Sequence, residues 1–144
     1  MFELKKEYVI NSDIENVWNF LTELREVTSC IPNLENLQIE TPTKFRGKIK
    51  PPFSFVKGKF SVESELIELK EKERLTIAVR GSSIGASFKI MMTMLISYVS
   101  GTKIHLDVRV ETTGLLKTLP KSLIHKVVED IETPMLRCIK EKLE

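Results

Sequence analysis

Cysteine and histidine are the residues of this chain whose chemistry is most often catalytic or metal-binding, and there are two of each. Cys30 lies in the stretch TSCIPN and Cys138 near the C-terminus, while His105 and His125 lie between them. A nucleophilic cysteine needs a nearby base, and a zinc ion needs about four converging ligands. Neither histidine is placed by its sequence pattern to meet Cys30, and no closely spaced pair of such ligands occurs. We therefore predict no catalytic residue and no metal site.

Both cysteines are expected to be structural. Cys30 follows an amphipathic run and precedes Pro32, so we predict a small buried side chain at the corner between a helix and a strand. Cys138 has the same expectation beside Leu136 and Ile139. Two distant cysteines do not suggest a disulfide framework, and reduced thiols in a cytosolic protein fit better. The N-terminal residues contain no apolar signal segment, which also favours a cytoplasmic protein.

Composition indicates a single globular domain over residues 1–144, since 42% of the residues are hydrophobic. The net charge of +2 provides no overall field for nucleic acid, so we predict no nucleic-acid partner. No glycine-rich nucleotide-binding motif occurs, so we predict no cofactor. The apolar run FKIMMTMLISYV, with Lys89 inside it, is too short to span a bilayer.

The elements that would position any site follow from hydrophobic periodicity. Residues 2–10 alternate as a strand, with Lys6 interrupting the apolar side. Two short helices follow, with Ser12 or Asp13 as N-cap and an end before Pro32. About six strands occupy residues 34–111, and after Gly114 the period becomes that of a helix. The prediction is an α+β fold in which a curved antiparallel sheet of about six or seven strands wraps round one long C-terminal helix.

An apolar cavity between this sheet and the long helix is the predicted ligand site. Methionine suits it because its flexible side chain adapts to varied apolar ligands. A buried serine hydroxyl needs a partner, so it would orient a ligand or bond to the backbone. Simple filling of the core by the same side chains remains an open alternative. The candidates, chosen for inward parity and helical register, are Phe60, Val62, Ser64, Val79, Met92, Met94, Leu123, Ile124 and Val127.

A basic run from Lys44 to Lys59 holds six cations and no acidic residue. Its strand parity places Arg46, Lys48 and Lys50 on one side, next to Pro51-Pro52, Phe53 and Phe55. Such a run suits docking on an anionic membrane surface or on an acidic protein. An ordinary solvated strand face is the alternative.

The stretch DIENVWNFLTELREVTSCIPNLENL resembles the opening of the CoxG family of carbon monoxide dehydrogenase subunits, within the START-like, helix-grip (SRPBCC) superfamily. FVKGKF, GTKIHLDVRV and TGLL are further points of similarity, so the resemblance covers nearly the whole chain. The family's glycine after Cys-Ile-Pro is Asn33 here, a residue that also tolerates left-handed backbone.

This resemblance implies a helix-grip fold and an accessory role to a molybdenum hydroxylase of the carbon monoxide dehydrogenase type. Together with the apolar cavity, it favours a non-catalytic protein that holds a lipid, isoprenoid or quinone-like molecule, with peripheral contact to the inner membrane face. One alternative is a polyketide cyclase or hydratase, which needs a polar dyad that the pattern does not reveal. Another is a docking scaffold without a ligand.

Overall fold

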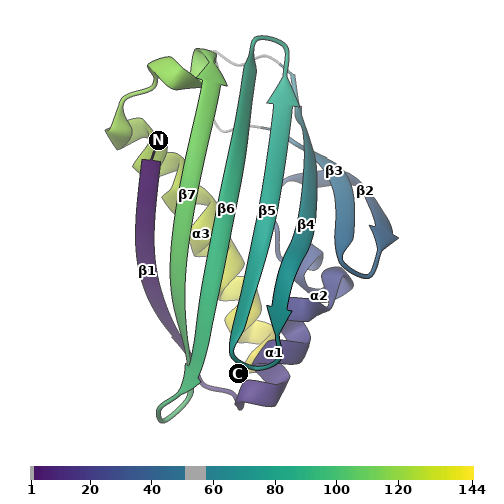
Figure 1. Cartoon of the computed structure of the whole chain (residues 1–144), viewed down its shortest axis with the longest axis vertical. Helices are drawn as coiled ribbons and strands as arrows, with labels where there is room; N and C mark the ends of the chain where they lie inside the picture. Colours follow the sequence, from purple (N-terminus) through teal and green to yellow (C-terminus); the bar gives the residue numbers. More distant parts are fainter. Residues whose placement is uncertain (1, 51–57) are drawn as a thin grey trace.

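A computed structural model describes residues 2–50 and 58–144 of the chain, and it contains one antiparallel sheet crossed by a long helix (Figure 1). The order of elements is the predicted one: a strand, two short helices, six further strands and a final helix. The α+β prediction is therefore confirmed. The elements are β1 (Phe2–Ile10), α1 (Ile14–Thr22), α2 (Leu24–Ser29), β2 (Leu34–Thr41), β3 (Lys44–Ile49), β4 (Phe60–Lys70), β5 (Arg74–Ser83), β6 (Ala86–Tyr98), β7 (Thr102–Gly114), the 3-10 helix η1 (Leu115–Thr118) and α3 (Lys121–Leu143).

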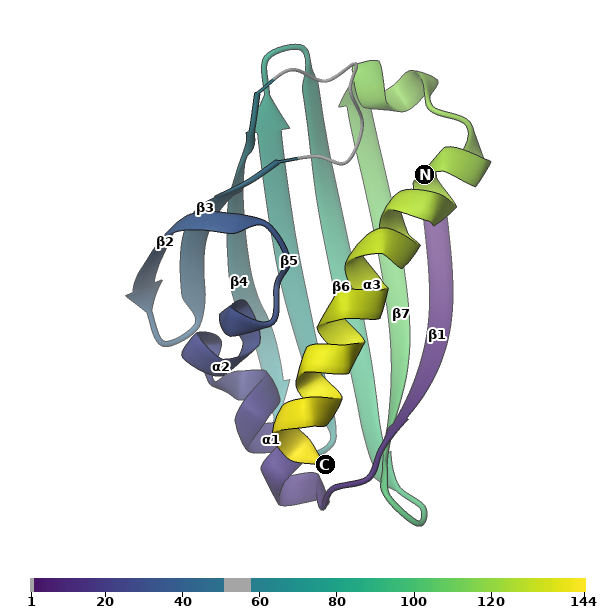
Figure 2. The same cartoon turned by 180° about the vertical axis from the view of Figure 1, so that it is seen from behind.

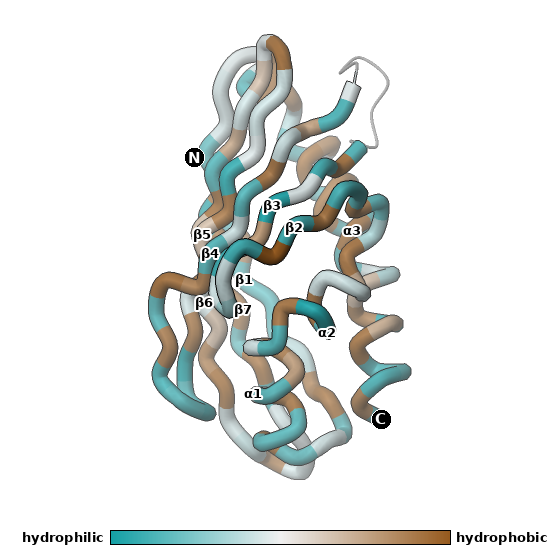
Figure 3. The backbone as a smooth tube through the Cα atoms, turned by 90° about the vertical axis from the view of Figure 1, so that its right-hand side faces the viewer, coloured by the Kyte–Doolittle hydropathy of each residue, from teal (hydrophilic) through white to brown (hydrophobic). Residues whose placement is uncertain are grey.

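The seven strands follow the spatial order β1-β7-β6-β5-β4-β3-β2, and every neighbouring pair is antiparallel. All helices lie on one face of the sheet, and α3 crosses that face diagonally (Figures 2 and 3). We call this the concave face and the opposite one the convex face. The arrangement is the helix-grip fold, as expected from the resemblance.

Local chemistry explains how the chain enters the helices and leaves them. Asp13, rather than Ser12, caps α1, because its side chain accepts a hydrogen bond of 2.7 Å from the backbone N–H of Asn16. The chain leaves α2 at Cys30, and Asn33 then takes a φ of 60°. Asn33 therefore adopts the left-handed conformation that asparagine was expected to tolerate here.

Most of the buried apolar side chains form two separate clusters, which lie toward opposite ends of the sheet. The lower cluster joins α1 and α2 to the sheet and is the larger one, and it contains the single tryptophan, Trp18. The upper cluster lies where β4, β6 and η1 meet. The lower cluster consists of Ile10, Val17, Trp18, Phe20, Leu21, Leu24, Cys30, Phe45, Leu66, Leu75, Ile96 and Ile104; the upper cluster consists of Phe60, Val62, Ala86 and Leu116.

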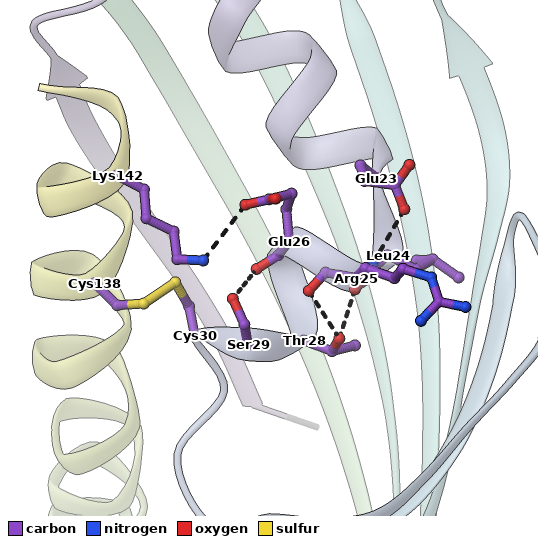
Figure 4. Close-up of polar contacts among 9 residues, drawn as sticks. All are labelled: Glu23, Leu24, Arg25, Glu26, Thr28, Ser29, Cys30, Cys138 and Lys142. Carbon is purple, nitrogen blue, oxygen red and sulfur yellow. Dashed lines mark hydrogen bonds and ion pairs between the residues drawn. A yellow bond between two sulfur atoms is a disulfide. The ribbon is translucent and has the colours of Figure 1, made fainter.

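A disulfide joins Cys30 at the end of α2 to Cys138 in α3 (Figure 4), with 5.5 Å between the Cα atoms. The prediction of two reduced thiols is wrong, because the fold brings together residues that lie 108 positions apart in sequence. Cys30 is buried at the helix-to-strand corner, as predicted, but it also tethers the C-terminal half of α3. The cysteines therefore no longer support a reducing compartment.

Within the described ranges, no helix has both the length and the apolar character that a bilayer crossing requires.

Candidate functional site

A zone between the two clusters is lined by apolar side chains. They face the space between the sheet and α3 and are only half-buried. On the sheet, Val79, Ile90 and Val110 lie side by side in the strand register, and Met92 is in the next row. All of them are half-buried and belong to neither cluster. Facing them from α3 are four residues with the same properties. We call these eight residues the middle zone: Val79, Ile90, Met92, Val110, Leu123, Ile124, Val127 and Val128.

The incomplete burial of the middle zone is the notable property of this interior. Side chains between a sheet and a covering helix are usually packed to crystal-like density. Here every residue of α3 is described, and none of them is buried. Helix α3 therefore covers the sheet without burying these side chains completely.

The structure divides the nine predicted ligand-binding residues into two groups. Val79, Met92, Leu123, Ile124 and Val127 lie together in the middle zone. The other four lie at its borders: Phe60 and Val62 are buried in the upper cluster, Ser64 is buried beside Val79, and Met94 packs against the lower cluster.

A polar group that the sequence analysis did not identify lies at the edge of the grip, between β1 and α3. Lys6 and Tyr8 are on the concave side of β1, opposite Leu106 and Ile104 of β7. The Lys6 ammonium lies 3.5 Å from a carboxylate oxygen of Glu132. Burial raises the pKa of the Tyr8 phenol above its usual range, and a hydrogen bond to Glu132 and the charge of that residue raise it further.

A cleft of about 290 Å³ opens at this edge. It is continuous with the middle zone, because Val128 belongs to both. The only sign of the polar group in the sequence was Lys6, a charge at an apolar position of the first strand. Its partner Glu132 is on a distant helix, so no local pattern could reveal it. The cleft is lined by Leu4, Lys6, His125, Val128, Glu129, Glu132 and Thr133.

A second, wider hollow of about 620 Å³ lies between the first two helices and the end of α3. Glu26 and Lys142 form an ion pair of 3.4 Å across it (Figure 4). None of the nine predicted ligand-binding residues lines either hollow. The wider hollow is bordered by Asn16, Asn19, Phe20, Thr22, Glu23, Glu26, Lys142 and Leu143.

The basic strand β3 places its charges on the convex face, where neighbouring strands supply acidic partners. Arg46 forms ion pairs with Glu40 of β2 and, at 3.2 Å, with Glu63 of β4. Lys44 also contacts Glu63, at 2.8 Å, and this hydrogen bond holds the pKa of the Glu63 carboxyl below its usual range. The charge of Arg46, a predicted docking residue, is therefore largely compensated.

The other two predicted docking residues, Lys48 and Lys50, are exposed and form no ion pair within residues 2–50 and 58–144. The adjoining Pro51, Pro52, Phe53 and Phe55 lie outside the described residues. Among the described residues, no group of three or more histidine, cysteine or acidic side chains is arranged to hold a metal ion.

Several solved structures share this fold. A conserved protein from Geobacillus kaustophilus superposes with a TM-score of 0.88 at 14% identity, over 99% of this chain and 95% of that one. A START superfamily protein from Mycobacterium smegmatis gives 0.70 at 12% identity, over 98% and 96%. The di-domain ARO/CYC BexL from the BE-7585A biosynthetic pathway gives 0.66 at 12% identity, over 99% of this chain and 50% of that one.

Sequence comparison identifies the family. Among curated proteins, no sequence matches this chain. The model of the family described as the CoxG subunit of carbon monoxide dehydrogenase matches residues 7–144, which is nearly the full length. These residues include the Trp18 helix, the Cys-Ile-Pro corner and the whole of α3. The chain belongs to the CoxG family of carbon monoxide dehydrogenase subunits.

Proposed function

We propose that this protein binds a lipophilic small molecule, of the lipid, isoprenoid or quinone type, against the middle zone. The observation that carries the proposal is a set of half-buried apolar residues that face inward between two packed clusters. A ligand that covered about 200 Å² of this apolar surface would gain roughly 5 kcal/mol from removing it from water. The half-open interior also gives such a ligand a route in without unfolding of the domain.

The polar group at the edge of the grip supplies a place for the ligand's polar end. The Lys6 ammonium and the Tyr8 phenol are hydrogen-bond donors, and both lie next to Glu132. A ligand carbonyl or hydroxyl oxygen would accept from one of them while the apolar part contacts Val128 and Met92. Quinones and isoprenoid alcohols combine an apolar chain with one such polar end.

The family name supports a partner for this carrier. In our proposal the protein serves a molybdenum hydroxylase of the carbon monoxide dehydrogenase type, to which it brings or from which it removes the lipophile. The residues of this chain hold and orient the ligand, and the redox chemistry belongs to the partner enzyme.

Two neighbouring methionines of β6, whose side chains point to opposite faces of the sheet, provide the test. Met92 faces the middle zone, whereas its neighbour Met91 lies on the convex face with 41% of its surface exposed. Met92→Trp should fill part of the ligand space and weaken binding of an apolar fluorophore about tenfold or more. Met91→Trp, the matched control, should bind as the wild type does.

Native mass spectrometry of the purified protein tests the class of ligand. A co-purifying lipophile that is lost from Met92→Trp and retained by Met91→Trp would support the proposal. Equal fluorophore binding by both variants would remove the middle zone as the site. A protein that carries no lipophile and binds no apolar fluorophore would instead be the docking scaffold of the alternative interpretation.

A second candidate function is favoured by the polar group itself. Glu132 with Lys6 and Tyr8 is the kind of polar constellation that a cyclase or hydratase requires for proton transfer. The shared fold of an ARO/CYC protein is consistent with this alternative. Glu132→Gln should leave fluorophore binding intact under both functions. Loss of turnover of a polyketide-like substrate in this variant would favour the enzyme, while no turnover by the wild type would exclude it.

A further inference from the structure

Segments that lack acidic residues meet at one end of the molecule. Three stretches of sequence contain no aspartate or glutamate, namely residues 41–62, 74–106 and 112–128. The upper cluster brings all three together, since Phe60, Ala86 and Leu116 belong to one stretch each. These stretches meet at the end of the sheet that carries the β5–β6 turn, η1 and the start of α3 (Figures 1 and 2).

Two apolar side chains project from the same end. Ile84, in the β5–β6 turn, has 98% of its surface exposed, and Leu115, the first residue of η1, has 47%. They lie close together, because the Leu115 backbone N–H donates a 2.9 Å hydrogen bond to the Gly85 carbonyl oxygen. We call Ile84 and Leu115 the apolar tip.

Lysines lie on the elements that meet at the same end as the apolar tip. Lys48, Lys50, Lys117 and Lys121 are exposed, and within residues 2–50 and 58–144 none of them forms an ion pair. Lys59 contacts Glu35 of β2. The Lys59 hydrogen bond and charge, with a contribution from Lys50, hold the pKa of the Glu35 carboxyl below its usual range. The local potential at this end is thus positive.

We propose that the apolar tip and the lysines around it dock on an anionic membrane surface. An exposed isoleucine and leucine enter the boundary between headgroups and acyl chains, while nearby lysines remain among the anionic headgroups. Two projecting side chains are too few for the buried core of a stable protein interface, which covers about 800 Å² on each partner. An acidic protein partner therefore fits the tip less well than a lipid surface.

The opposite end of the sheet provides a natural comparison. The β6–β7 turn there also exposes apolar residues, with Tyr98 at 60% and Val99 at 67%. The nearest cation, Lys103, is paired with Glu7 at 2.9 Å, and the neighbouring β4–β5 turn mixes Lys70 with Glu73 at 2.8 Å. Apolar exposure without net positive charge should not attract an anionic membrane.

Docking by the tip would place η1 and the first turn of α3 against the lipid. The middle-zone residues Leu123 and Ile124 lie in that turn, and Val127 lies in the next one. In this position the protein could exchange its lipophile with the membrane, a consequence that rests on the proposed function. Docking itself does not rest on the proposed function, because it needs no ligand in the interior.

Sedimentation with vesicles made of equal parts phosphatidylcholine and phosphatidylglycerol tests the charge. The double variant Lys117→Gln/Lys121→Gln should bind at least tenfold more weakly than the wild type, since each lysine near such a surface is worth about fivefold. The control Lys70→Gln/Lys72→Gln removes two lysines from the opposite end and should bind unchanged. Wild-type binding should disappear on pure phosphatidylcholine and fall with added salt.

Fluorescence tests which end enters the membrane. Trp18 is buried and gives a constant background, so Ile84→Trp and Val99→Trp report on the two ends. Addition of the anionic vesicles should shift the emission of Ile84→Trp to the blue and leave Val99→Trp unchanged. A shift at Val99→Trp alone, or no vesicle binding by the wild type at low salt, would overturn the proposal.

Apolar-fluorophore binding measured without vesicles separates the two proposals. A wild type that binds the fluorophore but not the anionic vesicles would contradict membrane docking and leave the middle-zone site standing. A wild type that binds the vesicles but not the fluorophore would contradict the middle-zone site and leave docking standing.

Discussion

At the scale of single residues, β1 shows how the fold accommodates a charge at an inward position. Lys6 lies on the face of β1 whose other positions are mostly apolar. Glu132 of α3 provides its counter-charge at 3.5 Å. The parity of Lys6 is readable from the sequence, because side chains alternate between faces along a strand. The identity of its partner is not, because that depends on where α3 crosses the sheet.

The Tyr8 phenol gives a pH-dependent prediction. Its pKa is raised above the ordinary value of 10.0, chiefly by burial and then by Glu132, so the folded protein keeps it neutral where the unfolded chain ionises. The resulting stability is fully present below about pH 10 and is lost as the pH rises through the folded pKa. The free energy of unfolding, measured in urea on both sides of pH 10, should fall less steeply for Tyr8→Phe than for the wild type.

Tyr98→Phe is the matched control for this measurement, since it removes an exposed phenol at the end of β6. Equal pH slopes for the wild type and Tyr8→Phe would show that Tyr8 is not held neutral by the fold.

Gly114 gives a second prediction at this scale. It has a φ of 65°, and a Cβ atom there would lie 2.1 Å from the carbonyl oxygen of Gly85. Gly58 also has a positive φ, of 83°, but among the described residues a Cβ atom there would have no neighbour within 4 Å. Both Gly→Ala variants carry the cost of left-handed backbone, about 1–2 kcal/mol. Gly114→Ala should cost about 1–3 kcal/mol more in thermal or urea unfolding, and equal losses would contradict the close approach.

At the scale of elements, α3 is attached unevenly along its length. Its C-terminal half packs on the lower cluster through Leu136, Ile139 and Leu143, and it is tethered to Cys30 through Cys138. Its N-terminal half has the half-buried contacts of the middle zone and an edge contact between the rings of His125 and Phe2. The helix itself was readable from its period of 3.6 residues. The tether was not, because a separation of 108 positions carries no information about proximity.

Removal of the disulfide should therefore destabilise the protein more than the loss of one small buried side chain. Cys30→Ala should cost about 2–5 kcal/mol, the usual range for a native disulfide that closes a long loop. Cys138→Ala should cost about the same, and the double variant no more than about 1 kcal/mol beyond either, because all three lose the same bond. Urea unfolding with and without a reducing agent measures these costs. A wild type unaffected by reduction, or additive single losses, would contradict the tether.

At the scale of the whole molecule, strand parity and helical period were sufficient to predict the fold. Val79 and Met92 face inward and Met91 outward, as alternation requires. Parity could not distinguish Phe60, closed in the upper cluster, from Met92 in the loosely packed zone, since that depends on the spacing between α3 and the sheet. Nor could it show that Arg46 meets Glu40 and Glu63 from neighbouring strands.

The separation of the two clusters leads to a prediction for the dynamics of the whole domain. Backbone amides in residues 121–131 of α3 should exchange with solvent faster than those in residues 132–143, which pack on the lower cluster and carry the disulfide. A lipophile bound to the middle zone would connect the helix to the sheet where side-chain contacts are now incomplete. Hydrogen exchange followed by mass spectrometry should then show slower exchange in residues 121–131 when an apolar ligand is added, with little change in residues 132–143. Uniform exchange along α3 without ligand would mean that its N-terminal half is as firmly packed as the tethered half, and a ligand effect confined to residues 132–143 would place the binding site in the wider hollow beside Phe20 and Leu143.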